Sequence, residues 1–175
     1  NNLTSVADKI DGNAGFCGDR EPSTSKSTSN GSGGTGTTIT YYGAYIRLYG
    51  NNKVPTFECQ NSSDLYTTSG SEYGNKALTY PIGLITADEI AYAGGVWDTI
   101  NRDFYLYTDN MYWSITPHDY TEAYKANMFA IDSSGCLYYG FGVNDTHGVR
   151  PVINLKADMQ INSGNGTASQ PYIVN

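Results

Sequence analysis

The sequence has few charged residues and very few basic ones. Charged side chains make up 15% of the 175 residues, against about a quarter in an average soluble domain. Lys and Arg together number 10, they are scattered along the chain, and the net charge is −7. Nucleic acids and anionic membranes are both bound through clusters of basic side chains. The composition therefore predicts no nucleic-acid binding and no membrane contact by this chain.

Long hydrophobic runs and a signal peptide are also missing. No apolar stretch approaches the roughly 20 residues of a transmembrane helix, and the chain opens at Asn1 without an initiator Met. We expect it to be cut from a longer precursor whose anchor lies outside this sequence. Ser, Thr, Asn, Gly and 16 Tyr provide most of the polarity. That composition is commoner in extracellular and surface-displayed proteins, so an extracellular or cell-surface location is expected.

Recognisable catalytic motifs are absent. The chain has no Gly-x-Ser-x-Gly, no His-Glu-x-x-His, no phosphate-binding loop and no Cys-x-x-Cys, and it has two His. Asp88 and Glu89 fall where a helix is expected to begin, and acidic residues there complement the helix dipole rather than form a catalytic pair. The sequence predicts a protein that is not an enzyme and that uses no cofactor and no metal.

Three cysteines allow one disulfide. Cys17 and Cys59 bracket the most irregular part of the chain, and a bridge between them would close a loop of about 40 residues and stabilise the fold. Cys136 is then expected to be a buried free thiol, although pairing with one of the other two stays open.

The length predicts one domain with a real core. Residues 1–11 are expected to be the end of a truncated N-terminal helix, because Val6 and Ile10 share a helical face and Gly12 ends the run. Residues 12–175 would form the domain. Within it, residues 21–38 are low in complexity, with almost nothing apolar, and predict a flexible Ser/Thr/Gly loop.

The pattern of the remaining segments predicts an α+β fold with an antiparallel sheet. One helix is clear: Thr86-Ala87-Asp88-Glu89 is a capping box, and Gly94-Gly95 ends the helix. Aromatic and β-branched alternation predicts a strand at residues 39–49, and short strands with turns between them are expected at residues 104–108, 111–115, 127–132, 136–143 and 149–155.

Several segments resemble, in the same order, blocks found in Firmicute surface proteins. They are YPIGLITADEIAYAGG (residues 80–95), YWSITP (112–117), MFAIDSSG (128–135), GVRPVINLK (148–156) and GTASQPYIV (166–174). Many such proteins resemble type IV pilins or type II secretion pseudopilins at their N-terminus. Their C-terminal part is similar to the C-type lectin-like fold, which formylglycine-generating enzymes and retroelement-diversified receptors also use. The resemblance implies that fold here, with short antiparallel strands, one or two helices and long loops.

In diversified lectin-like receptors, ligand-contacting residues precede the closing Gly-x-Arg strand. Carried onto this chain, the resemblance implies a contact surface whose aromatic rings supply area and whose short polar groups supply hydrogen bonds. Strand side chains alternate, so only the outward-facing half can qualify, and strand tyrosines could instead pair across the sheet. The candidates are Trp113, Ser114, Thr116, His118, Asp119, Tyr120, Tyr138, Tyr139, Phe141, Asn144, Asp145 and His147.

Two neighbouring features are expected to be structural. Arg150 lies between apolar residues, so it should be paired with loop carbonyls or a carboxylate, and a ligand contact is the alternative. Asn144-Asp145 partly matches the Trp-Asn-Asp element of calcium-dependent lectins, but Val143 stands where Trp would be. Neither Glu-Pro-Asn nor Gln-Pro-Asp occurs, so calcium is not predicted.

Together these observations favour an extracellular, non-enzymatic ligand-binding domain for adhesion or reception, displayed on a bacterial surface or pilus. Its expected partner is an extracellular protein or glycan. The alternative is a structural pilin-like filament subunit that uses the same faces for self-assembly.

Overall fold

The computed structural model describes residues 6–23, 39–49, 53–70, 77–121, 125–167 and 169–175. Most of the predicted Ser/Thr/Gly loop (24–38) and the first half of the expected N-terminal helix (1–5) lie outside these residues. At the described edge of the loop, the Ser23 amide donates to the Tyr41 carbonyl at 2.7 Å.

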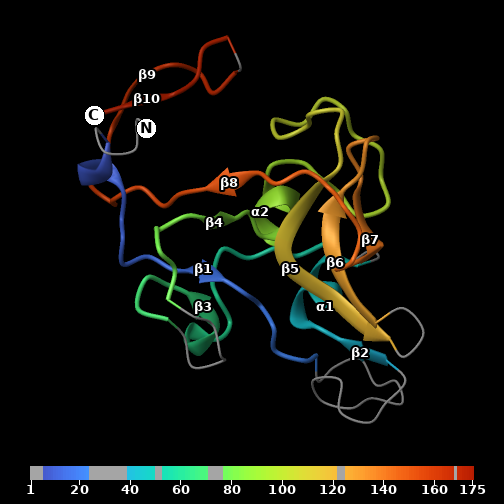
Figure 1. Cartoon of the computed structure of the whole chain (residues 1–175). Helices are drawn as coiled ribbons and strands as arrows, with labels where there is room; N and C mark the ends of the chain where they lie inside the picture. Colours follow the sequence, from blue (N-terminus) through green and yellow to red (C-terminus); the bar gives the residue numbers. More distant parts are fainter. Residues whose placement is uncertain (1–5, 24–38, 50–52, 71–76, 122–124, 168) are drawn as a thin grey trace.

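The centre of the molecule is a four-stranded antiparallel sheet. It consists of β2 (Ile39–Tyr41), β5 (Tyr112–Thr121), β6 (Lys125–Ile131) and β7 (Leu137–Gly142), in the order β2-β5-β6-β7. The last three strands form a meander, which Figure 1 shows as the long paired ribbons of the domain. Strands with period-2 apolar residues bury one face, and here that face carries Tyr112, Phe129 and Ile131.

Two short helices pack on the sheet and complete the core. Helix α1 (Gly43–Leu48) and helix α2 (Ala87–Tyr92) both contact β5 and each other. The expectation of an α+β fold with antiparallel pairing is therefore confirmed. The core that they enclose contains Ala44, Leu48, Ala87, Ile90, Trp97, Phe104, Tyr112, Phe129, Ile131 and Leu137.

The predicted strand at 39–49 is wrong beyond Tyr41. Residues Gly43–Leu48 form helix α1, in which Ala44, Tyr45 and Leu48 are the buried residues. Tyr45 and Leu48 lie one and four positions after Ala44, so the three side chains share one face of the helix, which points toward the core. The aromatic and β-branched composition favours a strand locally, but the burial of this face against β5 outweighs that preference.

Helix α2 forms as its capping box predicts. The Glu89 amide donates to Thr86 Oγ1 at 3.1 Å, and the Thr86 amide donates to Glu89 Oε2 at 2.8 Å. Gly94 follows the helix with φ of 109°, a left-handed conformation that glycine adopts without a steric penalty. Asn101 Nδ2 donates to the Gly94 carbonyl at 2.8 Å and fixes that end.

Three two-stranded ribbons surround the sheet. They pair β1 (Phe16–Cys17) with β3 (Leu65–Tyr66), β4 (Gly83–Leu84) with β8 (Pro151–Val152), and β9 (Ile161–Ser163) with β10 (Ile173–Val174). A single 3-10 turn, η4 (Ser62–Asp64), precedes β3.

Two further predicted strands need correction. Residues 104–108 form no strand: bends and turns at 104–106 bury Phe104 in the core, and Leu106 and Tyr107 pack against it. The strand expected at 149–155 is confined to Pro151–Val152, and it pairs with β4 instead of closing the main sheet.

The described part of the N-terminal segment is not an α-helix. Ala7–Lys9 form one 3-10 turn, η2, and Ile10 then makes an antiparallel bridge with Leu155. The Lys156 amide donates to the Lys9 carbonyl at 3.0 Å. This pairing with the C-terminal part takes the backbone hydrogen bonds that a continued helix would need. Figure 1 shows η2 and the β9–β10 hairpin on the same side of the molecule, away from the main sheet.

The predicted disulfide is confirmed. Cys17 and Cys59 are bonded, with their Cα atoms 5.5 Å apart. Cys136 is free and buried, and burial raises the pKa of its thiol to about 11. Such a thiol is a poor nucleophile at neutral pH.

Candidate functional site

The expected contact region divides into an outward and an inward set. Along β5, exposure alternates, so that Trp113 and Ile115 are half-buried while Ser114 and Thr116 are buried. The outward set forms what we call the aromatic surface: Trp113, Tyr138, Phe141 and His147.

His147 is the centre of the aromatic surface. Its ring lies 4.5 Å from the Trp113 ring and 4.7 Å from the Phe141 ring, both in edge-on geometry. Phe141 also contacts Tyr138, with centroids 6.1 Å apart. Edge-to-face pairs of this kind add about 0.5–1.5 kcal/mol each to area burial. The four rings therefore form one cluster on the outer side of the sheet.

Backbone pairing brings His147 to Trp113 across 34 positions of sequence. The Trp113 amide donates to the Gly148 carbonyl at 3.0 Å, and the Gly148 amide donates to the Met111 carbonyl at 2.9 Å. Before this bridge, the Gly142 amide donates to Asp145 Oδ2 at 2.9 Å and closes the turn after β7. Asn144 and Asp145 are exposed at that turn, beside the cluster.

An apolar groove of about 540 Å³ adjoins the same side of the sheet. Ile115 lies two positions from Trp113 on β5, and Met128 is paired with Phe141 across β6 and β7. Ile115 and Met128 of the groove therefore neighbour Trp113 and Phe141 in the sheet, but none of the four rings of the aromatic surface lines the groove. Its lining consists of Tyr66, Leu78, Ile82, Gly83, Leu84, Ser114, Ile115, Met128, Val149 and Pro151.

The buried candidates bond inside the protein. Ser114 Oγ donates to the Phe129 carbonyl at 2.8 Å, and Thr116 Oγ1 accepts from the Ala87 amide at 2.9 Å, which fastens helix α2 to β5. Asp119 accepts from Asn127 Nδ2 at 2.6 Å. These three residues are buried in this structure, so the outward-facing half of the candidates does not include them.

His118 lies inside an aromatic cage. Its ring stacks on Trp97 at 5.6 Å and meets Tyr45 and Phe129 edge-on at 4.9 Å and 4.8 Å. Burial lowers the pKa of His118, opposed by Asp119, whose Oδ2 lies 3.1 Å from His118 Nδ1. A neutral imidazole in the core follows, and its role is packing.

The other two candidates are on strands. Tyr120 is half-buried on β5, opposite Thr40 and Ala126. Tyr139 lies in β7, and its side chain falls outside the described part of the structure. Neither residue is among the four rings of the aromatic surface.

Arg150 ties two loops together. Its guanidinium donates to the Leu106 carbonyl and lies 4.9 Å from the centre of the Tyr112 ring. The side chain is half-buried, and these contacts are of the loop-carbonyl kind expected from its apolar neighbours.

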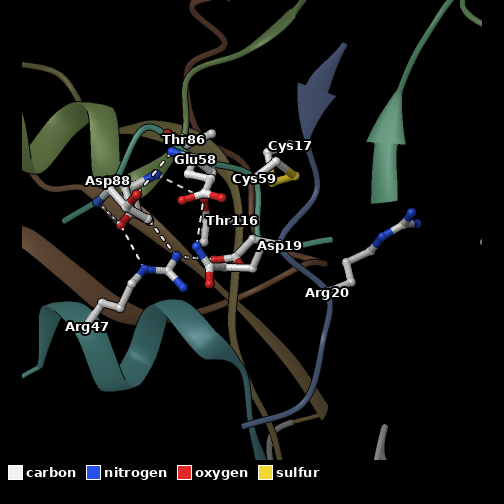
Figure 2. Close-up of polar contacts among 12 residues, drawn as sticks. Cys17, Asp19, Arg20, Arg47, Glu58, Cys59, Thr86, Asp88 and Thr116 are labelled. Carbon is white, nitrogen blue, oxygen red and sulfur yellow. Dashed lines mark hydrogen bonds and ion pairs between the residues drawn. A yellow bond between two sulfur atoms is a disulfide. The ribbon is translucent and has the colours of Figure 1, made fainter. Parts of the chain in front are cut away.

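A second hollow, next to the disulfide, was not predicted from the sequence. It has a volume of about 220 Å³, and Figure 2 shows Arg47, Asp19 and Asp88 gathered near Cys17–Cys59. Arg47 Nε and Nη2 donate to the two oxygens of Asp88 at 2.9 and 2.8 Å, and Nη2 also donates to Asp19. The lining is Gly15, Phe16, Cys17, Asp19, Arg47, Thr56, Phe57, Glu58, Cys59, Leu65, Leu84, Thr86, Asp88, Glu89, Val152, Ile153 and Asn154.

Electrostatics in this cavity follow from burial and pairing. Burial raises the pKa of Asp19, and the neighbouring Arg47 opposes that shift. Burial by itself would lower the pKa of Arg47. The hydrogen bonds from Arg47 to Asp88 and Asp19 together have a larger effect in the opposite direction, so the pKa is raised. The guanidinium is charged at any physiological pH. No local signal in the sequence could have placed Arg47 here, because Asp88 lies 41 positions away and the segment of Arg47 favours a strand.

Within the described ranges, no group of three or more His, Cys, Asp or Glu side chains is placed to hold a metal ion. The helices of these ranges are also too short or too polar to cross a membrane. Comparison with protein-family models, curated proteins and solved structures finds no match for this chain.

Proposed function

We propose that this chain is an extracellular, non-enzymatic ligand-binding domain with a C-type lectin-like fold, displayed on a bacterial surface or pilus. The ligand is a protein or glycan that contacts the aromatic surface. The main support is the cluster formed by the rings of Trp113, Phe141 and His147, which are sheet neighbours of Ile115 and Met128 in an apolar groove. Aromatic rings that are only half-buried give large contact area at a low cost in side-chain entropy.

Polar groups at the rim suit this role. Asn144 and Asp145 are exposed next to the rings and can form hydrogen bonds with a ligand. His147 Nε2 is buried and has no hydrogen-bond partner within the described residues.

The compartment is supported by the disulfide and by the residue composition. Disulfides persist in oxidising environments, and Cys17–Cys59 braces the most irregular part of the chain. The resemblance of the sequence blocks between residues 80 and 174 to Firmicute surface proteins is the ground for proposing the surface location and the lectin-like fold.

Binding of the purified protein to an array of glycans and a panel of extracellular proteins tests the proposal. Against any ligand found, Trp113→Ala and Tyr138→Ala should weaken binding at least about tenfold, the usual effect of a central aromatic contact. Tyr105→Ala is the matched control, since Tyr105 is 68% exposed and outside the aromatic surface. Equal binding by all variants, or no ligand in either panel, would overturn the proposal.

The alternative of a filament subunit is favoured by a different element. The β9–β10 hairpin exposes Ile161, Tyr172 and Ile173, and an isolated two-stranded hairpin is marginally stable in water. Contact with a neighbouring subunit would cover these side chains. Filaments on cells that disappear with Ile161→Asp and Ile173→Asp would support this alternative, and their persistence would exclude the hairpin as the contact.

A further inference from the structure

Phe57 and Tyr92 form a stacked aromatic pair on the surface. Their rings are 4.1 Å apart and 12° from parallel, and the two residues are 71% and 53% exposed. The Tyr92 hydroxyl donates to the Pro55 carbonyl at 2.9 Å, which holds the pair in place. Large side chains left this exposed commonly mark an interaction site.

This aromatic pair lies at the cavity beside the disulfide. Phe57 is itself part of the cavity lining, between Thr56 and Glu58. The Thr56 amide donates to Asp88 Oδ1 at 3.0 Å, so the segment that carries Phe57 is anchored on the Arg47–Asp88 pair. This hydrogen bond connects the rim of the cavity to its charged interior.

The charges of the lining are not balanced. Four carboxylates, those of Asp19, Glu58, Asp88 and Glu89, face one guanidinium, that of Arg47. Arg47 is shared by Asp19 and Asp88. Glu89 uses one oxygen in the capping box. Within the part of the chain that the structure describes, the Glu58 carboxylate forms no ion pair.

We propose that Phe57, Tyr92 and the adjoining cavity form a docking surface for a lysine side chain of a partner protein. The ammonium group lies near Glu58 and Glu89, where negative charge is in excess. The alkyl chain packs along the apolar lining, such as Phe16 and Val152, and the flanking peptide covers the aromatic stack. A cation near an exposed aromatic ring is attracted by the face of the ring, in addition to the ion pair.

Charge complementarity selects this occupant. An acidic or neutral polar group would be repelled or left unpaired by the excess carboxylates. The surface is distinct from the aromatic surface around His147, so this proposal does not rest on the proposed function.

The probe is Nα-acetyl-lysine-N-methylamide, titrated into the ¹⁵N-labelled protein and followed by NMR. The amides of Thr56, Glu58 and Asp88 should shift in a saturable way. The norleucine analogue, which keeps the alkyl chain without the charge, should not shift them, and butylamine, which lacks the peptide groups, should bind more weakly. Equal binding of norleucine, tighter binding of butylamine, or no shifts with the lysine probe would overturn the proposal.

Glu58→Gln and Phe57→Ala should each weaken the lysine probe about two- to fivefold, as exposed ion pairs and cation–aromatic contacts do. Both positions are exposed, so the variants are expected to fold. Asp158→Asn removes the same charge from an exposed position outside the cavity lining and should leave binding unchanged. Equal weakening by Asp158→Asn would show only a general charge effect and contradict the site. Trp113→Ala should bind the probe as the unmodified protein does.

Discussion

The guanidinium of Arg47 forms a bidentate pair with the carboxylate of Asp88, at 2.9 Å from Nε to Oδ1 and 2.8 Å from Nη2 to Oδ2. Arg47 belongs to the last turn of α1 and Asp88 to the first turn of α2. The pair therefore joins the two helices that cover the sheet, and Asp19 connects the disulfide-bonded segment to the same guanidinium.

Removing the guanidinium of Arg47 should lower the free energy of unfolding. Arg47→Met leaves Asp19 and Asp88 buried without a counter-charge, and breaking a buried pair from one side costs about 3–5 kcal/mol. Because the Arg47 side chain is 19% exposed, we expect about 2–4 kcal/mol in urea unfolding. Arg102→Met, at an exposed position, should change stability by less than about 0.5 kcal/mol. Equal stability of the two variants would mean that solvent already compensates the carboxylates.

The disulfide should stabilise the folded protein mainly by restricting the conformations of the unfolded chain. Cys17 and Cys59 are 42 positions apart, which gives about 4 kcal/mol in the chain-entropy model. We expect the Cys17→Ser/Cys59→Ser double variant to lose stability of that order in denaturant unfolding. Cys136→Ser, which replaces the free buried thiol, serves as the comparison and should lose less. A double variant as stable as the parent protein would contradict the bracing role.

His118 should make stability depend on pH. Its folded pKa is lowered, so below pH about 6.5 the unfolded chain binds a proton that the folded protein excludes. The free energy of unfolding should therefore fall as pH drops below 6.5, by up to about 1.4 kcal/mol per pH unit, and be independent of His118 well above 6.5.

His118→Phe keeps a ring in the aromatic cage and should remove this dependence. Asp19, whose folded pKa is raised, contributes with the opposite sign but is present in both proteins. The difference in pH slope between parent and variant, measured by urea unfolding from pH 5 to 7.5, isolates His118. Identical slopes would show that the pKa of His118 does not differ between the folded and unfolded states.

The capping box of α2 offers a local test. Thr86→Ala removes the oxygen that accepts from the Glu89 amide, and loss of an N-cap costs about 1 kcal/mol. Thr146→Ala, at an exposed position, is the control. Thermal unfolding should place Thr86→Ala clearly below the control, and coincident curves would mean that water replaces the cap.

Features set by neighbouring residues could be predicted from the sequence. Thr86 and Glu89 are three positions apart, so the capping box and the start of α2 depend on no distant contact. The strands β6 and β7 are flanked by turn residues and alternate in hydrophobicity, and they form within a few positions of their predicted bounds. The pairing of Cys17 with Cys59 followed from their positions around an irregular segment.

Other features were decided only by tertiary structure. Residues Gly43–Leu48 became helical because Ala44 and Leu48 bury one face against β5, an energy that no local pattern contains. Which half of the contact region faces outward depended on the register of β5 with β6, since a shift by one residue reverses every side chain. The Arg47–Asp88 pair and its cavity exist because folding brings residues 41 positions apart within hydrogen-bond distance. The sequence by itself determined the local hydrogen bonds, and the burial of the core determined which distant residues meet.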